Sequence, residues 1–355
     1  MAPAVALEPL KNVVLALAGA VILLAVFLLI KRGTIALAGS RTKRREPAIS
    51  QMLFQAMQAS PIDASGFRRL GRFDRKLVRS ILLGLALDLR GDTGDAIATL
   101  YCELGYLKQD IARLTSWSPT RRANAAADLG LIHTTDSIPG LVRALQDSDV
   151  RVRQAAVWAI GQVGTAKSLA GLVPLLGDHS LVVANRAQEV LAERGREIAD
   201  SILRYAETTS SRSGRLGAVQ LIGWLRITTG GDFLLRGMRD MDPEVRVKSV
   251  KAAAAIGDPR FVETFHSRLD DVRWEVRCQA ARGLSVFGDP ASVPRLASAL
   301  RDRHWWVRFY AATALAEVGP AGEDALSSAL HDPDPSVQEM ARYLLERGDA
   351  VPALP

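Results

Sequence analysis

Apolar and small residues recur along this chain at the spacing of a helix. In the second half they lie three, four and seven positions after a regularly placed arginine, as Ala280, Ala281 and Leu284 do after Arg277. These offsets bring the side chains onto one face of a helix. The chain contains no run of alternating apolar and polar residues long enough to indicate a sheet. The pattern therefore predicts an all-α protein.

The arginine recurs at a nearly fixed interval, which is the main sign of an internal repeat. The series is Arg122, Arg153, Arg186, Arg215, Arg246, Arg277 and Arg308. Each arginine-bearing helix is followed by a second, shorter apolar stretch that starts near Pro, Ser or Asp, as helices do. Two helices in about 31 residues are typical of an α-solenoid of HEAT-type helix pairs. We expect it at 117–350, after a divergent helical capping segment at 48–116 and before a disordered tail at 351–355.

An aspartate stands six residues before most of these arginines. An acid at this place can accept hydrogen bonds from the first amides of the next helix. It can also form a bidentate ion pair with the guanidinium group of an arginine. We therefore predict a structural Asp/Arg ladder between repeats, in preference to a phosphate-binding row. Its members are Asp147 and Arg153, Asp240 and Arg246, Asp271 and Arg277, and Asp302 and Arg308. In the middle units Ser180 and Thr209 stand in the aspartate positions.

The repeats resemble the HEAT-like repeats of phycobilisome lyases over about 118–348. That resemblance implies the fold, but it says little about function, because the repeat is a packing device. A second resemblance rests on Leu-Asp-Leu-Arg-Gly at 87–91, on Glu-Leu-Gly-Tyr-Leu at 103–107 and on the N-terminal segment described next. These features resemble a group of bacterial membrane-anchored HEAT proteins associated with membrane glycosyltransferases of polysaccharide synthesis, and they imply a companion-subunit role.

An apolar run without charged side chains covers residues 13–30. As a helix it would be ~27 Å long, close to the ~30 Å of a hydrocarbon core, and it exceeds the ~7–15 residues usual in a cleaved signal peptide. We therefore expect residues 1–47 to hold a single transmembrane anchor and a basic juxtamembrane segment. The basic residues after the run are also candidates for contact with anionic lipid head groups: Lys31, Arg32, Arg41, Lys43, Arg44 and Arg45.

The charge distribution sets the expected orientation and argues against nucleic acid as a partner. More basic residues follow the run than precede it, so the positive-inside rule predicts a single-pass inner-membrane protein with its N-terminus outside and its solenoid in the cytoplasm. The formal net charge of the chain is +7. Residues 31–79 hold twelve basic and three acidic residues, so the repeats are close to neutral. A nucleic-acid binder more often carries its positive charge on the repeats.

The sequence shows no constellation of catalytic residues. The five histidines lack a second ligand at metal-binding spacing. The two cysteines, Cys102 and Cys278, stand far apart and outside any C-x-x-C motif. Motifs for phosphate or dinucleotide binding and for a nucleophilic serine are missing as well. We expect no enzymatic activity, cofactor, metal or small-molecule substrate.

Two surfaces are candidates for contact with a partner protein. The first carries tryptophans, which are enriched at interface hot spots: Trp158, Trp306, Trp305 and Trp274. For Trp158 and Trp306, packing within the solenoid is as good an explanation as contact with a partner. For Trp305 and Trp274 packing is the better explanation. The second is a column of polar and small residues on the second helices, including Arg143 and Arg236, which would line a concave wall open to an extended segment or a helix. The sequence leaves this choice open.

These features together predict a non-catalytic scaffold or regulatory subunit that binds a partner protein on the cytoplasmic face. The second resemblance makes a membrane glycosyltransferase the expected partner. A bilin lyase-like HEAT enzyme and a nucleic-acid-binding HEAT protein are the alternatives.

Overall fold

The computed structural model describes residues 41–59 and 62–347, and these residues form helices, turns and short connections without a strand. The all-helical prediction is therefore confirmed for this part of the chain. The chain divides into two compact units, Met1–Asp110 and Ile111–Pro355. We call them unit 1 and unit 2.

Unit 1 is a small helical cluster. Its elements are a helix over 41–58, then η2 (Ser65–Arg69), α2 (Arg72–Asp88), α3 (Asp92–Glu103) and the start of α4 (Tyr106–Arg113). The side chains of Val78, Leu82 and Ala86 lie one turn apart on α2, and all three are buried. Asp110 is buried too, and it accepts hydrogen bonds from Tyr101 at 2.5 Å and from Arg79 at 2.8 Å.

The membrane location predicted from the sequence is corrected here. Among the described residues, no helix is both long enough and apolar enough to cross a bilayer. The predicted span, the run at 13–30, lies outside the described residues, as do Lys31 and Arg32. Two of the described lipid candidates make contacts inside unit 1. Arg45 forms an ion pair with Asp74 at 2.6 Å, and Arg41 lies over the ring of Phe73 at 4.5 Å.

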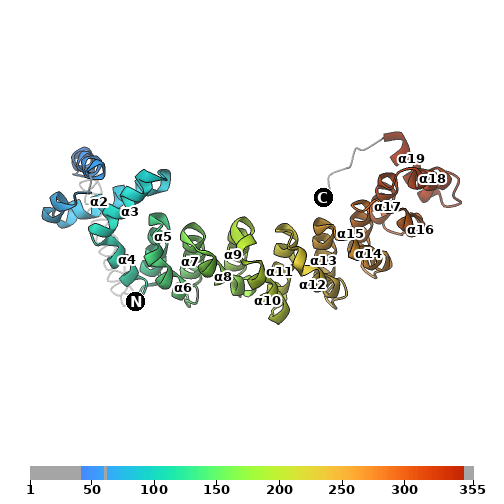
Figure 1. Ribbon diagram of the computed structural model, residues 1–355, viewed down its shortest axis with the longest axis horizontal. Helices are drawn as coiled ribbons and strands as arrows, with labels where there is room; N and C mark the ends of the chain where they lie inside the picture. The colour runs from blue at the N-terminus through green and yellow to red at the C-terminus, as the bar shows by residue number, and fades with distance from the viewer. Residues whose placement is uncertain (1–40, 60–61, 348–355) are drawn as a thin grey trace, which may run out of the picture. The chain divides into compact units, whose positions relative to one another are not determined.

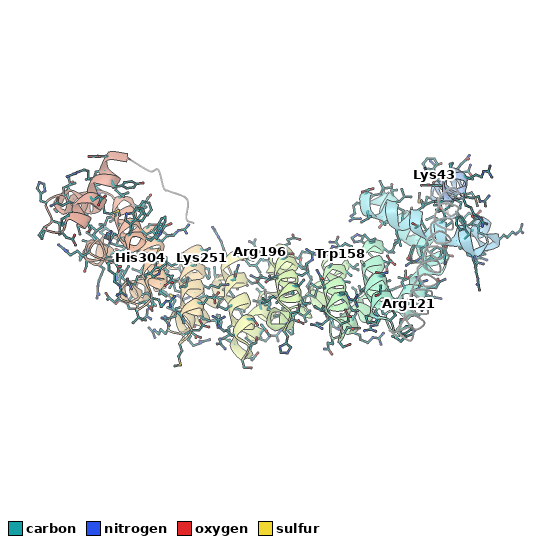
Figure 2. All side chains as sticks on the ribbon, turned by 180° about the vertical axis from the view of Figure 1, so that it is seen from behind. Lys43, Arg121, Trp158, Arg196, Lys251 and His304 are labelled. Carbon is teal, nitrogen blue, oxygen red and sulfur yellow. The ribbon has the colours of Figure 1, made fainter. Side chains whose placement is uncertain are left out.

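The other two lipid candidates, Lys43 and Arg44, are exposed on the helix over 41–58. Figure 2 shows Lys43. No contact in the described part of the chain assigns them a role.

Unit 2 consists of helix pairs in two rows (Figure 1). The first helices of the pairs pack side by side, and they are α5 (Pro119–Ile132), α7 (Val150–Val163), α9 (Leu181–Arg194), α11 (Arg212–Trp224), α13 (Pro243–Ile256), α15 (Trp274–Ser285), α17 (Trp305–Glu317) and α19 (Pro335–Arg347). The second row holds α6 (Ile138–Ala144), α8 (Ala166–Ala170) with η4 (Val173–Gly177), α10 (Ala199–Thr208), α12 (Gly231–Gly237), α14 (Val262–Arg268), α16 (Val293–Ala299) and α18 (Pro320–Ala329). Short 3₁₀ turns precede most second helices: η3 (Thr135–Ser137), η5 (Gly195–Ile198), η6 (Thr228–Gly230), η7 (Pro259–Phe261) and η8 (Pro290–Ser292).

Small residues allow the first helices to approach closely. A Cβ added to Gly223 of α11 would lie only 2.8 Å from the Cα of Ala252 in α13. Gly130 of α5 meets Ala159 of α7 in the same way, again at 2.8 Å. Because no side chain fits between these backbones, α5 and α7, and likewise α11 and α13, are in direct contact along their buried stripes.

The first helices from α5 to α17 begin at positions 119, 150, 181, 212, 243, 274 and 305, so the stride of the repeat is constant. This regularity corrects the alignment on which the arginine series was built. The position equivalent to Arg153 in the next repeat is 184, and it holds an alanine that is buried. Arg186 lies two positions further on, where it pairs with Glu189 at 2.8 Å. The sequence interpretation took the nearest arginine because the true position carries none.

Candidate functional site

Four ladder arginines join two repeats through bidentate ion pairs. The guanidinium of Arg277 donates from Nε and Nη2 to both carboxylate oxygens of Asp302 in the next repeat, at 2.6 and 2.8 Å. Its Nη1 donates to the backbone carbonyl of Asp271 at 2.9 Å. The same bidentate pair recurs between Arg122 and Asp147, Arg153 and Asp178, and Arg246 and Asp271. Bidentate arginine–carboxylate pairs fix orientation as well as distance, so the ladder sets how successive repeats stack.

The aspartate of each pair also closes the turn before the next first helix. An oxygen of Asp302 accepts the backbone N–H of His304 at 2.8 Å. The equivalent bond is made by Asp147, Asp178, Asp240, Asp271 and Asp332. Burial disfavours the charged form of Asp302, but the hydrogen bonds from Arg277 and His304 outweigh it, and the pKa of this carboxyl lies below its usual value.

The partners within the ladder differ from those that the sequence suggested. The sequence paired each aspartate with the arginine six positions later. In the structure, Arg153 donates to the backbone carbonyl of Asp147 at 2.9 Å and not to the carboxylate of that residue. The carboxylate partner of Arg153 is Asp178 in the next repeat. Asp178 was missed because positions were counted back from Arg186. Asp178 directly follows the second helical segment after Arg153. A search forward from Arg153 to the end of that segment would have found it.

The ladder ends at Arg308. Its Nη1 bonds to the carbonyl of Asp302 at 2.8 Å. Asp332 closes the equivalent turn before α19, but it stands 24 residues after Arg308, whereas the other pairs are 25 residues apart. The Nε of Arg308 is buried and has no hydrogen-bond partner among the described residues. The nearby acid Asp332 forms its ion pair with Arg301 instead.

The ladder is interrupted once inside unit 2, between α9 and α11. We call each pair of arginine and aspartate a rung of the ladder. One rung is replaced completely: Ala184 stands at its arginine position and Thr209 at its aspartate position. Thr209 keeps the turn contact and accepts the N–H of Ser211 at 3.2 Å. Tyr205 fills the adjoining space, where its hydroxyl donates to the carbonyl of Pro174 at 3.3 Å.

The rung after the interruption is weakened. Arg215 approaches Asp240 only to 3.9 Å, and the Nε of Arg215 is buried without a hydrogen-bond partner among the described residues. This region therefore has the loosest electrostatic connection between repeats in the described ladder.

Two of the predicted tryptophans begin α17 and belong to an aromatic cluster. Trp305 stacks on Phe309 with ring centroids 5.2 Å apart, and Trp306 stacks on Tyr310 at 6.2 Å. Trp305 is 39% exposed, while Trp306 is half-buried. Aromatic contacts of this kind contribute to stability beyond the area that they bury.

The third predicted tryptophan, Trp274, also has a packing partner. Its ring lies on that of His304 in the next repeat, with centroids 3.7 Å apart and an interplanar angle of 6°. Trp274 therefore takes part in the contact between neighbouring repeats.

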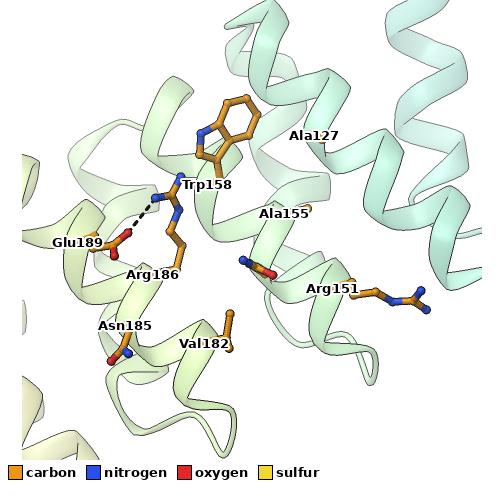
Figure 3. Close-up of a pocket in the computed structure, with 9 residues that line it drawn as sticks. Ala127, Arg151, Ala155, Trp158, Val182, Asn185, Arg186 and Glu189 are labelled. Atoms are coloured by element: carbon orange, nitrogen blue, oxygen red, sulfur yellow. Dashed lines mark hydrogen bonds and ion pairs between the residues drawn. The ribbon is translucent and has the colours of Figure 1, made fainter.

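The fourth predicted tryptophan, Trp158, lines a groove between α7 and α9. The groove has a volume of about 530 Å³ and is bordered also by Gln154 and Asn185. Figure 3 shows Arg186 extending toward Trp158 from the neighbouring helix, with its ion pair to Glu189 on one side. The groove thus combines an aromatic surface with amide and charged groups, which suits a polar peptide better than a purely apolar ligand.

A second groove in the same row was not predicted. It lies between α11 and α13, has a volume of about 220 Å³, and is lined by Trp224, Gln220, Lys248 and Lys251. Trp224 is 55% exposed. Other repeats hold Gln162, Glu193, Ala255 and Val286 at its position, and this contrast could have singled it out.

A third groove, of about 390 Å³, borders the starts of α13 and α15 with Arg212, Glu244 and Glu275. All three grooves therefore lie on the first-helix row, between α7 and α15. We call this surface the first-helix face. Trp158 and Lys251, which occupy equivalent positions three repeats apart, are both visible along it in Figure 2.

The other predicted surface lies on the second row. Arg143 of α6 is exposed. Arg236 of α12 is exposed as well and pairs with Glu207 at 3.2 Å. The structure therefore places the two candidate surfaces on different rows of helices. Among the described residues, no group of three or more histidine, cysteine or acidic side chains could hold a metal ion.

Residues 109–192 and 262–346 match the family model of HEAT repeats. Both stretches lie almost wholly in unit 2, whose helix pairs form a solenoid of HEAT-type repeats. A comparison with curated proteins gives no match.

Several solved structures of low identity match this chain. The mutant Kap121p is 13% identical, with a TM-score of 0.55, and the match covers 83% of this chain and 41% of Kap121p. YibA of Escherichia coli is 19% identical over 76% of this chain and 97% of its own, with a TM-score of 0.44. The CpcE–CpcF complex of phycocyanin lyase from Nostoc sp. PCC7120 is 17% identical over 67% of this chain and 94% of that chain, with a TM-score of 0.32. At such identities the likeness to Kap121p extends to the fold alone.

Proposed function

We propose that this HEAT-repeat protein is a non-catalytic scaffold that holds a segment of a partner protein along its first-helix face. The observation that carries the proposal is the row of three grooves between neighbouring first helices, two of which are lined by a tryptophan. Tryptophan and arginine dominate interface hot spots because they bury a large area and still offer polar contacts. Trp158 beside Arg186, and Trp224 beside Lys251, provide an aromatic ring next to a cation.

The ladder supports the same proposal because it fixes the helices on both sides of two grooves, through Arg153 and Asp178 at the first and Arg246 and Asp271 at the third. A surface that is already ordered loses little conformational entropy when a partner binds. A stack of helix pairs also offers an extended series of equivalent sites, which suits an extended partner segment.

The second-helix surface is the weaker candidate. Arg143 and Arg236 are single exposed cations, and Arg236 already has an ion-pair partner in Glu207. Exposed charges that lack a neighbouring aromatic group contribute little to affinity.

The identity of the partner rests on resemblance alone. A glycosyltransferase remains the expected partner because of the motifs at 87–91 and 103–107, and no contact in the described structure adds to that expectation. The bilin lyase-like alternative rests in the same way on the resemblance of the repeats.

Site-specific crosslinking in cells tests the proposal. A photoreactive amino acid replaces Gln154 on the first-helix face, and the matched variant carries it at Arg143 on α6. We expect one defined partner to be crosslinked from position 154 and not from position 143. Crosslinking of that partner from position 143 alone would assign the interface to the second row and overturn the proposal.

A further inference from the structure

The first-helix face carries three cations that lack a strong acidic partner. Lys248 donates to Gln220 at 3.0 Å and approaches Glu244 only to 4.0 Å. Lys251 and Arg282 are exposed and have no ion pair among the described residues. We call these three residues the basic band.

Other cations of the same face are neutralised by neighbours. Arg151 pairs with Asp149 at 2.8 Å, Arg186 with Glu189 at 2.8 Å, and Arg212 with Glu244 at 2.7 Å. The basic band is therefore a local excess of positive charge beside cations that already have acidic partners. Such an excess attracts anionic groups of a partner.

Aromatic rings flank the basic band. Trp224 lines the same groove as Lys248 and Lys251. The guanidinium of Arg282 lies over the ring of Tyr310, 5.7 Å from its centroid, which limits the orientations of the arginine. The band thus has an oriented cation at one end and an exposed aromatic surface at the other.

The spacing of the cations suits an extended polypeptide. Lys251 and Arg282 occupy equivalent positions in neighbouring repeats. Packed helices lie about 8–10 Å apart. A peptide in the polyproline II conformation advances about 3.1 Å per residue with three residues per turn, so its side chains i and i+3 lie on one face about 9 Å apart. Two side chains separated by three positions along a peptide therefore match the step from one cation to the next.

From this charge and spacing we propose that the first-helix face binds an extended acidic segment of its partner, with two carboxylates three positions apart on Lys251 and Arg282. An apolar side chain next to the first carboxylate lies on Trp224, in the groove of about 220 Å³. This inference rests on the proposed scaffold function, and it adds the chemistry of the partner. Duplex DNA fits less well, because tight binding draws on about 6–10 phosphate contacts and the basic band offers three cations.

A random peptide library displayed on phage and selected on the full-length protein tests the inference. We expect enrichment of peptides with Asp or Glu at positions i and i+3 and an apolar residue beside the first acid. Selected peptides without this acidic spacing would overturn it, and so would a failure to enrich any sequence.

The enriched peptide is then measured by fluorescence anisotropy against charge variants. Lys251→Glu combined with Arg282→Glu should weaken binding at least tenfold, and a peptide with lysines at both acidic positions should recover affinity for this variant. Arg236→Glu on α12 is the matched control and should bind as the unmodified protein does. Lys251→Gln with Arg282→Gln gives an intermediate loss with a smaller risk of misfolding, and circular dichroism checks the helix content of every variant. Equal affinity for all variants would overturn the inference.

Two further measurements separate this inference from the proposed function. If the partner still crosslinks to position 154 in the Lys251→Glu/Arg282→Glu protein with unchanged yield, the scaffold function stands and the acidic contact is wrong. If crosslinking at position 154 is missing from the unmodified protein, the scaffold function itself fails. Displacement of the peptide by duplex DNA at lower concentration than by unlabelled peptide would assign the basic band to nucleic acid and overturn the inference.

Discussion

Arg277 and Asp302 connect two successive repeats through two parallel hydrogen bonds of 2.6 and 2.8 Å. Both residues are largely buried, and the arginine is only 7% exposed. The same guanidinium also binds the carbonyl of Asp271 in its own repeat. One side chain thus holds the turn of one repeat against the turn of the next.

The first prediction concerns this pair. Arg277→Ala leaves a buried carboxylate without its countercharge, and removal of one member of a buried ion pair typically costs about 3–5 kcal/mol. We expect urea denaturation to show a loss of this size. Hydrogen exchange should accelerate mainly in α15 and α17, because each repeat contacts only its neighbours. The matched control is Arg236→Ala, an exposed surface pair, which should cost less than about 1 kcal/mol. A loss of similar size in both variants would contradict the structural role of the ladder.

The second prediction follows from the carboxylates of the ladder. Hydrogen bonds from Arg122 lower the pKa of Asp147, and burial opposes them without reversing the shift. A group whose pKa is lower in the folded state stabilises the protein fully above its unfolded pKa, and that contribution is lost as the pH falls through the folded pKa. We therefore expect constant stability from pH 7 to about 5 and a progressive loss below the unfolded value of about 4.

Asp147→Asn isolates this contribution. The asparagine can still accept the N–H of Asp149, but it carries no charge. Its urea midpoint should lie below that of the unmodified protein at pH 7, and the two midpoints should approach each other as the pH falls below the unfolded pKa of about 4. Parallel curves over the whole range would show that the Asp147 carboxylate does not contribute through its charge.

The sequence predicted the helix pairs and the stride because both follow from local patterns. Small residues three, four and seven positions after Arg277 define one buried helical stripe, and the structure shows that stripe against α17. The recurring aspartates and arginines were identified from their spacing as well. Their true partners were not, because spacing along the chain does not reveal whether Arg153 reaches back to Asp147 or forward to Asp178.

The remaining differences also have physical causes. The register slipped at Arg186 because a buried alanine at 184 leaves no charged marker in the sequence. The groove at Trp224 depends on two neighbouring helices, and no single repeat displays it. The contact between Trp274 and His304 joins side chains of neighbouring repeats, which only the stacking of those repeats brings together.

The third prediction concerns the interruption of the ladder. Tyr205 lies beside Gly177 and Gly214, where an added Cβ at either glycine would collide with its hydroxyl. Tyr205→Ala removes the side chain that fills this space, and truncation of a partly buried aromatic residue should cost about 2–3 kcal/mol. Tyr205→Phe loses only the 3.3 Å hydrogen bond to Pro174, which should cost about 1 kcal/mol or less. Urea denaturation of both variants gives the comparison. A larger loss in the phenylalanine variant would contradict the packing role.

The fourth prediction compares two glycines inside helices. Gly223 of α11 faces Ala252 so closely that an added Cβ would lie 2.8 Å from the Cα of that residue. Gly223→Ala must therefore separate α11 from α13, and overpacking of this kind costs about 1–3 kcal/mol. Gly84 of α2 provides the matched control, because an added Cβ there meets nothing within 4 Å. Gly84→Ala should stabilise the protein by about 0.5–1 kcal/mol, since alanine loses less backbone entropy on folding. Opposite signs in thermal or urea denaturation are the expected result. Stabilisation by both substitutions would show that the first helices do not approach through their small residues.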